Sequence, residues 1–506
     1  MIVGTKPSEK LDWASFRTPP WSAQSPEWLQ LDEDLEEDHL ARLIDWGVDQ
    51  LDLQPLAASF GRSGSKPHRP DLMLKIVLFE IQRGRSSPAQ WFLDTKENKV
   101  LHWLGLGIRP VRSVWYQFAF RIQRWLDDWN KAILGFAQER LGRKLGERSS
   151  LDGTSVEANA SRHHLLNREQ VQQREQLLRA ATTDDTVGRA IDKRPYWMAK
   201  QPHTRLRQLQ QYTTARAKLE EQWEENQRRI PSKRREENSL RMSIADPDAF
   251  LGKDKHNVFR PLYNVQYVRD VDSPFIVAYE TFSRGSDAGT LVPLVKRVQQ
   301  LTGHKPKEVL ADSGYVTGVD LADIDRLKIQ LYGPWKENDF SRKASTASQH
   351  LGKDQFTWDE SLQTYRCPAG KLLRFKGVQN RQRSLGRQER VENYCSDPKE
   401  CADCPLKAKC CPESKSGRNL NRSEHETLIE AHRRKMEQPE AKTTYKLRRQ
   451  TIEPAFGDGK EHRGLRRIRG RGLLRAKIQV ALTVLTHNIR QLANFVLGAG
   501  PEKNDT

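Results

Sequence analysis

The segment KEVLADSGYVTG, residues 307–318, places a short apolar run directly before a carboxylate. Val309, Leu310 and Ala311 have the composition of a strand buried inside a sheet, and Asp312 follows them. Because an unpaired charge in such a place costs several kcal/mol, Asp312 needs a cation, a group of hydrogen-bond donors or an exit to solvent. The chain must therefore fold so that one strand of a sheet ends where an acid can be accommodated.

The flanking segments predict the kind of sheet. SSLDGTSVEA around Asp152, LYNVQYV and FIVAYETF are extended, and RDVDSP between the last two suits a hairpin turn. A helix precedes KEVLAD, and its apolar stripe consists of Leu291, Leu294, Val298 and Leu301. Strand, hairpin, helix, strand is the order of an RNase H-like α/β core, a mixed sheet flanked by helices. In that core the strand carrying Asp152 lies beside the strand that ends at Asp312.

Helical patterns precede this predicted sheet. Pro70 opens a helix that stops at Gly84, and Ser87 caps a second helix, so the pair has the spacing of a helix-turn-helix. We expect Ser113 to cap a third helix, with an apolar face made of Trp115, Phe118, Ile122 and Trp125. This pattern fits a small helical bundle and a DNA-binding domain equally well.

A second helical region lies between residues 161 and 238, which are rich in Gln, Arg and Glu. It predicts a helical hairpin or arm, because apolar residues recur at near-heptad spacing at Leu209, Tyr212, Leu219, Trp223 and Ile230. The mixed charge of this region is also what a solvated helix face carries.

These patterns divide the chain into five parts. We predict an N-terminal all-helical DNA-binding domain over 1–145 and the first part of the RNase H-like catalytic domain over 146–335, with a helical insertion at about 161–245. An inserted subdomain with a Cys cluster follows over 336–440, and the C-terminal part of the catalytic domain, with an acid and a basic segment, over 441–498. Residues 499–506 are expected to form a flexible tail.

The charge of the chain indicates its partners. Lys and Arg outnumber Asp and Glu by 85 to 66, a formal charge of +19, which favours polyanions such as nucleic acid or an anionic membrane surface. No apolar run approaches the roughly 20 residues of a bilayer span, and the first 30 residues lack the order of a signal peptide. We expect a soluble, intracellular protein.

Two carboxylates that meet at one sheet edge repel each other unless a proton or a metal ion lies between them. Mg²⁺ accepts such hard oxygen ligands together with phosphate oxygens, and a pair of ions about 3.5–4 Å apart supports in-line displacement at phosphorus. Glu453 is the candidate third acid. It lies in residues 441–475, where 11 Lys and Arg stand against 3 acids, a net charge of +8 that suits a phosphate backbone.

These motifs carry a family resemblance. LDGTSVEANAS, SIADPDAF, YNVQ, LADSGY and IEPAFGDGK with the following RG and HNIRQL occur in an order that resembles the DDE transposases of bacterial insertion sequences, in particular the IS1182 group related to the IS4 type. The helical segment from about His39 to Arg124 is similar to the N-terminal domain of that group. The resemblance implies that Asp152, Asp312 and Glu453 form a catalytic triad that binds Mg²⁺ or Mn²⁺.

The resemblance also implies residues that contact DNA around the glutamate. The family has a Tyr, an Arg, the Glu and a Lys at set spacing; here Arg449, Glu453 and Lys460 keep the Arg-to-Lys part. Tyr445 has the family spacing to Arg448 instead, so either arginine can serve. The set expected at DNA consists of Tyr445, Arg448, Arg449, Lys460, Arg466, Arg467 and Arg469. The segment RPVRSVWYQF departs from the family, which tends to have an acid and a His there.

Each acid also has a purely structural interpretation. Asp152 and Asp312 precede glycine-containing turns, and Glu453 before Pro454 is a possible helix-start acid. The ordered set on one predicted sheet favours catalysis over these separate roles. For Asp287, ahead of the helix at 291–302, we predict capping, and an accessory role at the carboxylate site is the alternative.

The cysteines form a local cluster. Glu453 comes 141 positions after Asp312, more than the sheet requires, and this interval contains all six cysteines, five of them from residue 395 to residue 411. Cys401 and Cys404 have the two-residue gap of a zinc knuckle, and Cys395 with Cys410 or Cys411 can complete a structural Zn²⁺ site. The alternative is a set of free buried thiols.

Together these features predict a transposase that binds the terminal inverted repeats of its element, cleaves phosphodiesters and joins the freed 3′ hydroxyl to target DNA, acting as a homodimer or larger homo-oligomer. One alternative is a non-catalytic nucleic-acid-binding protein, such as a decayed transposase. Another is an RNase H-like nuclease that cleaves without joining.

Overall fold

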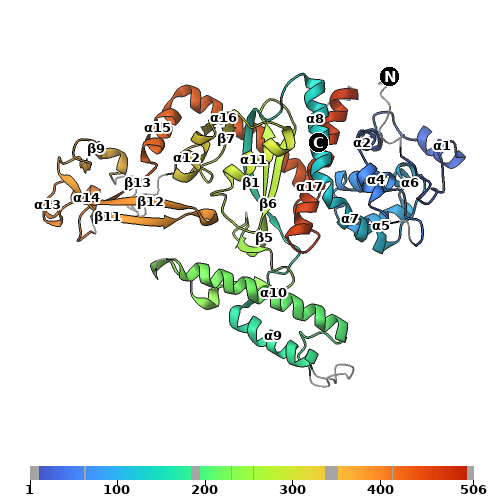
Figure 1. Ribbon diagram of the computed structural model, residues 1–506, viewed down its shortest axis with the longest axis horizontal. Coiled ribbons are helices and arrows are strands. Elements are labelled where there is room, and N and C mark those ends of the chain that lie inside the picture. The colour runs from blue at the N-terminus through green and yellow to red at the C-terminus, as the bar shows by residue number, and fades with distance from the viewer. Residues whose placement is uncertain are drawn as a thin grey trace.

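The computed structural model describes residues 11–61, 64–183, 194–229, 231–254, 256–336, 351–412 and 414–497. A central sheet lies between a group of N-terminal helices and a second sheet, and a long pair of helices projects to one side (Figure 1). The elongated shape follows from this arrangement, since the second sheet and the helical pair extend away from the central sheet in different directions.

The central sheet has six strands and is mixed. They are β1 (Arg148–Glu157), β4 (Phe250–Lys253), β5 (Phe259–Asp270), β6 (Ile276–Phe282), β7 (Glu308–Leu310) and β8 (Gln330–Tyr332). Their order is β4-β5-β1-β7-β8, and β6 also pairs with β5. Strand β5 is antiparallel to β1, β4 and β6, whereas β7 is parallel to β1 and β8. This mixed sheet flanked by helices fits the predicted RNase H-like core.

The register of the parallel pair positions the two aspartates. Ser150 of β1 lies opposite Leu310 of β7. Asp152 and Asp312 each follow two residues later, so both lie beyond the same end of the pair. The prediction that the strand carrying Asp152 lies beside the strand leading to Asp312 is confirmed.

Helices after β6 cover the sheet. They are α11 (Leu291–Thr302), α12 (Gly318–Arg326), α15 (Glu426–Glu437), α16 (Pro439–Glu461) and α17 (Leu473–Leu497). Helix α16 packs on the face that carries Asp152 and its cross-strand neighbour Tyr267, since the ring of Tyr267 stacks on Phe456 with centroids 4.7 Å apart. The four apolar residues predicted for α11 are all buried, because they form the stripe that faces the core.

The N-terminal helices share one hydrophobic core with the central sheet. They are α1 (Pro26–Glu33), α2 (Leu40–Asp49), α3 (Gln54–Ala58), α4 (Pro70–Gln82), α5 (Pro88–Glu97), α6 (Lys99–Leu104), α7 (Arg112–Arg121) and α8 (Leu126–Leu141). Ser87 caps α5 as predicted, because its hydroxyl accepts the Ala89 N–H. The Ser113 cap was wrong: α7 begins at Arg112 after an extended Val111, so Ser113 lies inside the first turn.

Two helices form the projecting pair, which we call the arm. They are α9 (Arg168–Thr183) and α10 (Pro202–Gln227), with β2 (Leu165–Asn167) and β3 (Arg241–Ser243) paired at their base. The arm has its own small core, in which Tyr212 and Leu219 are buried against Val171 and Leu178. The predicted helical hairpin is therefore present, and Ile230 lies outside the described residues.

The second sheet, coloured orange in Figure 1, has five antiparallel strands, and two short helices lie between β12 and β13. They are β9 (Thr357–Asp359), β10 (Thr364–Arg366), β11 (Leu372–Gln382), β12 (Gln388–Cys395), β13 (Asn419–Ser423), α13 (Pro398–Ala402) and α14 (Lys407–Cys410). Single 3-10 turns lie at Ile122–Arg124, Pro231–Lys233, Glu237–Ser239, Lys353–Gln355 and Ser384–Gly386. The core of the second sheet, which includes Tyr365, Tyr394 and Leu373, is separate from the core of the central sheet.

Candidate active site

Asp152 lies in the middle of β1 under α16. Its Oδ2 is 3.0 Å from Nη1 of Arg448, and both side chains are mostly buried, with 23% and 15% exposed. The main chain of α16 also touches β1 here, since the Ser150 hydroxyl donates to the Arg448 carbonyl at 3.4 Å. Burial raises the pKa of Asp152, the Arg448 guanidinium opposes that rise, and the charge of Asp312 adds to it. The charged form of Asp152 therefore depends on a nearby cation.

Asp312 begins a tight turn after β7. Its Oδ1 accepts the Gly314 N–H at 2.7 Å, and a Cβ on Gly314 would lie only 2.9 Å from that oxygen. Tyr315, fully buried, donates its hydroxyl to the Gln266 side chain. Burial raises the pKa of Tyr315, and the charges of Asp287, Asp152 and Asp312 raise it further. One buried phenol therefore lies within electrostatic reach of three carboxylates.

Glu453 lies above this region on α16, but its side chain points to solvent. Half of it is exposed (51%), and its Oε2 is 3.3 Å from Nε of Arg449, which is itself 82% exposed. The helix crosses β1 on both sides of Glu453, since Arg448 contacts Asp152 and Lys460 contacts the Thr154 hydroxyl. The structure thus brings α16 over the strand that carries Asp152, while the Glu453 carboxylate is half-exposed and paired with Arg449.

The two candidate arginines of the family spacing have different partners. Arg448 reaches Asp152, and the Tyr445 ring lies 6.0 Å from its guanidinium carbon. Arg449 instead contacts Glu453, one helical turn further along α16. Of the two, Arg448 is therefore the arginine at the sheet edge.

Asp287 was predicted as a helix cap, and this prediction was wrong. Helix α11 begins after Thr290 without a side-chain cap, and the Asp287 carboxylate instead faces the sheet. Its Oδ1 accepts hydrogen bonds from Asn264 and Gln266, both at 2.7 Å. No spacing rule could have identified this contact, because Asp287 lies far in sequence from β5 and β7.

The donor chemistry of the two aspartates fits a divalent cation. Asp152 and Asp312 supply carboxylate oxygens, the hard ligands that Mg²⁺ and Mn²⁺ prefer. Over the described ranges, no three His, Cys, Asp or Glu side chains are grouped so that they could hold a metal ion as they stand. The predicted triad is therefore brought together only as the pair of aspartates, with Glu453 apart.

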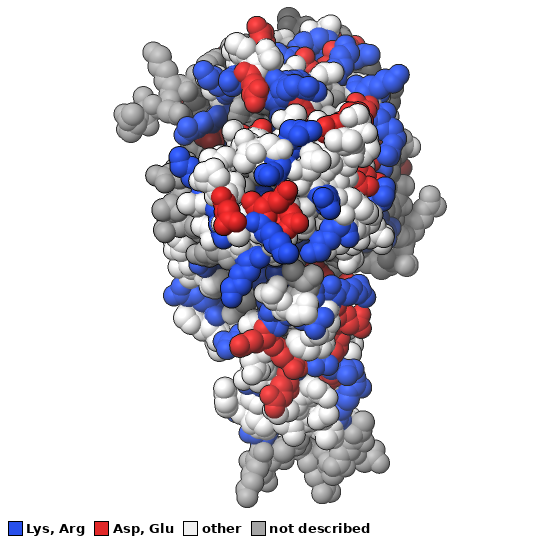
Figure 2. Space-filling model, turned by 90° about the vertical axis from the view of Figure 1, so that its left-hand side faces the viewer, with Lys and Arg blue, Asp and Glu red and all other residues white. Residues whose placement is uncertain are grey.

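The basic segment 441–475 follows the same strand. After α16 its backbone runs beside the end of β1, where the Ile468 N–H donates to the Glu157 carbonyl at 2.7 Å. Arg466 and Arg469 are exposed, Arg467 is half-buried, and Arg463 is buried next to Asp458. Figure 2 shows basic and acidic side chains interspersed on the side that presents the five-stranded sheet. Most of the predicted DNA-contacting set thus lies along one line from Asp152 to the end of β1.

The cysteines line one cavity, but not in the predicted combination. A cavity of about 20 Å³ is lined by Cys367, Cys401, Cys404, Cys410 and Cys411, whereas Cys395 ends β12 outside it. Burial raises the pKa of Cys410 to about 12, and the Cys401 sulfur is 2.9 Å from the Ser396 hydroxyl. Since no metal-holding group is found among the described residues, the zinc site predicted from Cys395, Cys401, Cys404 and Cys410 has no support in the structure.

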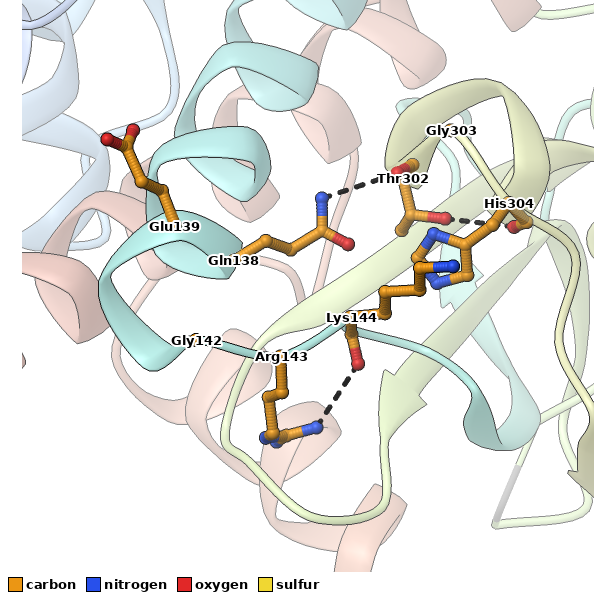
Figure 3. A pocket seen from close by; sticks show the side chains of 8 residues that line it. All are labelled: Gln138, Glu139, Gly142, Arg143, Lys144, Thr302, Gly303 and His304. Carbon is orange, nitrogen blue, oxygen red and sulfur yellow. Dashed lines mark hydrogen bonds between the residues drawn. The ribbon is translucent and has the colours of Figure 1, made fainter.

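A separate surface pocket of about 540 Å³ lies away from the aspartates (Figure 3). It is lined by the end of α8, with Arg143 and Lys144 just beyond, and by the end of α11 with His304. Gln138 joins the two sides by donating to the Thr302 carbonyl at 3.3 Å. Because these loops lead into β1 and β7, the pocket is at the opposite end of the parallel pair from Asp152 and Asp312.

The fold and this site define a class: a mixed α/β domain with two carboxylates just beyond the paired segment of two parallel strands and a basic helix across them. Residues 366–493 match the family described as Transposase DDE domain. The matched segment contains Glu453 and the basic segment, and it ends within α17. Comparison with curated proteins gave no match, and comparison with solved structures gave none. This segment is therefore similar to a transposase DDE domain, which supports a transposase.

No helix in the described part of the chain is both long and apolar enough to cross a membrane.

Proposed function

We propose that the protein is a transposase of the IS1182 type that cleaves DNA at the ends of an insertion sequence and joins them to a target by a two-metal DDE mechanism. One observation carries the proposal: the register that pairs Ser150 with Leu310 leads Asp152 and Asp312 beyond the same end of two parallel strands, directly under the helix of Glu453. The DDE domain match across that helix supports the same conclusion.

The residues of this chain would act as follows. Asp152 and Asp312 would hold Mg²⁺ or Mn²⁺, and Glu453 would complete the set after its side chain leaves Arg449. When bound, the metal neutralises phosphate charge and lowers the pKa of an attacking water. Arg448 and Lys460, which lie on either side of Glu453 on α16, would orient the scissile phosphate. Positioning and electrostatics supply most of the rate in such phosphoryl transfers.

The partners follow from the same assignment. The DNA would be the terminal inverted repeats and the target, contacted near the cut by the segment 445–469. The N-terminal helices would read the ends, with the exposed residues of α7 entering a major groove. We propose a homodimer or larger homo-oligomer that pairs two ends in the bacterial cytoplasm, associated with the nucleoid.

The proposal is tested with labelled element-end DNA and Mg²⁺. The wild type should nick at the end boundary and then join the freed 3′ hydroxyl to a second duplex. Asp152→Asn, Asp312→Asn and Glu453→Gln should each abolish nicking while end binding is kept, because metal ligands act in the chemical step. Near-normal nicking by any of the three would refute its place in the triad.

The same reaction separates the alternatives. Nicking without joining would identify an RNase H-like nuclease. End binding without nicking by the wild type would identify a non-catalytic DNA-binding protein. Both outcomes are visible on one denaturing gel, because nicked and joined strands differ in length.

A further inference from the structure

The hairpin of β11 and β12 projects from the second sheet. Strand β12 pairs with β11 as far as Gln382, whereas β10 pairs with β11 only at Leu372 and Leu373. Strand β13 pairs with β12 only from Val391 onward. The outer part of the hairpin is therefore two strands wide, and Figure 1 shows it directed from the second sheet toward the central sheet. We call residues 374–390 the ribbon.

The ribbon is strongly basic. It contains six Lys and Arg and one acid, a net charge of +5. The acid, Glu389, is buried and paired with Arg383, and Arg387 and Arg390 also have acidic partners. The other three basic side chains are exposed or half-buried and form no ion pair with any residue that the structure describes; they are Arg374, Lys376 and Arg381.

This charge differs from that of an ordinary solvated surface. A charged face exposed only to water usually carries both signs, so that neighbouring side chains attract each other. Like charges on a two-stranded hairpin repel, and the only acid of the ribbon is already neutralised inside the protein. The ribbon therefore presents positive charge that a polyanion would neutralise.

The shape and the uncharged side chains of the ribbon suit DNA in particular. Gln379, Asn380 and Gln382 are exposed, and amides of this kind donate hydrogen bonds to the DNA backbone. The major groove of B-DNA admits a two-stranded ribbon. From Arg374 to Arg381 the strand rises about 23 Å at roughly 3.3 Å per residue, the length of about seven base pairs.

The tip of the ribbon is fixed beside the edge where β7 ends. Nη1 of Arg387 donates to Oδ1 of Asp320 at 2.8 Å, and Asp320 is fully buried in the first turn of α12. A Cβ on Gly289, in the loop after β6, would lie 2.9 Å from Nη2 of Arg387. Since α12 begins at Gly318, shortly after Asp312, the ribbon starts next to the candidate active site and runs outward from it.

We propose that the ribbon is a DNA-binding element that lies along the duplex next to the cleavage site, with Arg374, Lys376 and Arg381 on phosphates. This inference rests on the proposed function. It extends the DNA-contacting surface from the segment 445–469 to the second sheet. The contact between Arg387 and Asp320 would hold the ribbon in line with the DNA that reaches Asp152 and Asp312.

The test measures binding of the full chain to a labelled element-end duplex and to a random duplex of equal length at several salt concentrations. The ribbon variant replaces Arg374, Lys376 and Arg381 together by Gln. For both duplexes it should reduce the dependence of log K on log salt concentration by about 2.7, since each lost phosphate contact contributes about 0.9.

The matched control removes the same charge from the opposite end of the second sheet. It replaces by Gln three exposed lysines on and after the short helices α13 and α14, and it should keep the salt dependence of the wild type; they are Lys399, Lys409 and Lys415. Surface substitutions of this kind change the free energy of unfolding by about 0.5 kcal/mol at most, so both variants should melt as the wild type does.

Hydroxyl-radical footprinting locates the contact. The wild type should protect about seven base pairs next to the nick that the ribbon variant leaves open, while protection elsewhere on the element end stays the same. Loss of protection over the whole end would contradict a local contact.

The outcomes separate this inference from the proposed function. If the ribbon variant keeps the salt dependence and the footprint of the wild type, the role of the ribbon is refuted and the proposed function stands. An equal loss of salt dependence in the ribbon variant and the lysine control would also refute it, because net charge alone would then explain the loss. If the wild type binds neither duplex, both the inference and the proposed function are refuted.

Discussion

Replacing Arg448 by Gln tests whether this arginine acts as a built-in cation for Asp152. The pair is 3.0 Å apart and mostly buried, so breaking it leaves a buried carboxylate without its counter-charge. Breaking a fully buried ion pair lowers the free energy of unfolding by about 3–5 kcal/mol, and breaking a fully exposed pair lowers it by about 0–1 kcal/mol. For these partly exposed side chains we expect a loss of about 1–3 kcal/mol in the free energy of unfolding. In a domain of about 150–250 residues, each kcal/mol corresponds to roughly 2–4 °C in Tm.

The neighbouring Arg449 is the matched control. Arg449 and Glu453 lie four residues apart on α16, and both side chains are exposed. Such pairs contribute about 0.3–0.5 kcal/mol to the free energy of unfolding. Arg449→Gln should therefore change Tm by about 2 °C at most.

Calorimetric scans with and without Mg²⁺ give the decisive comparison. A cation that binds the folded state raises its stability, and Mg²⁺ competes with Arg448 for Asp152. The rise in Tm on adding Mg²⁺ should be larger in Arg448→Gln than in the wild type. In Arg449→Gln this rise should equal that of the wild type. Equal losses in both variants, or an equal response to Mg²⁺ in all three proteins, would refute the idea that Arg448 takes the place of a metal.

Three further outcomes are expected. Gly153→Ala should abolish nicking because its Cβ would collide with Gln266, whereas Gly135→Ala, with open space around it, should leave activity unchanged. Burial raises the pKa of Glu80 to about 8, so the protonated side chain stabilises the fold fully below pH 4.5, and this contribution is lost as the pH rises through about 8. Glu80→Gln should therefore flatten the fall of Tm over that pH interval. Curves of Tm against pH that run parallel in the variant and the wild type would contradict this. Neutralising Arg466, Arg467 and Arg469 should weaken binding to any duplex and reduce the dependence of log K on log salt concentration by about 0.9 for each lost phosphate contact. If the triple variant kept the full salt dependence and lost only its preference for element ends, the C-terminal segment and not the N-terminal helices would read the sequence.

Local patterns in the chain were enough to predict the central sheet. An apolar run before Asp312, a turn sequence between two alternating segments and one apolar stripe on the following helix each specify an element through nearest neighbours. The pairing of β1 with β7 follows from the order of these elements, since a parallel strand after a crossover helix joins the first strand. The positions of Asp152 and Asp312 were therefore predictable before any tertiary contact was known.

Contacts between distant segments could not be predicted in this way. A helix turns about 100° per residue, so a shift of one position decides whether Arg448 or Arg449 faces Asp152, and only the packing of α16 on Tyr267 sets that rotation. The same packing leaves the Glu453 side chain half-exposed. Asp287 reaches the sheet because Gly153 and Gly314 leave room for it. Cys367 joins four of the other cysteines around one cavity because two loops of the second sheet come together. Sequence patterns specify elements through local periodicity, whereas these placements depend on how complete elements pack against one another, which no local rule contains.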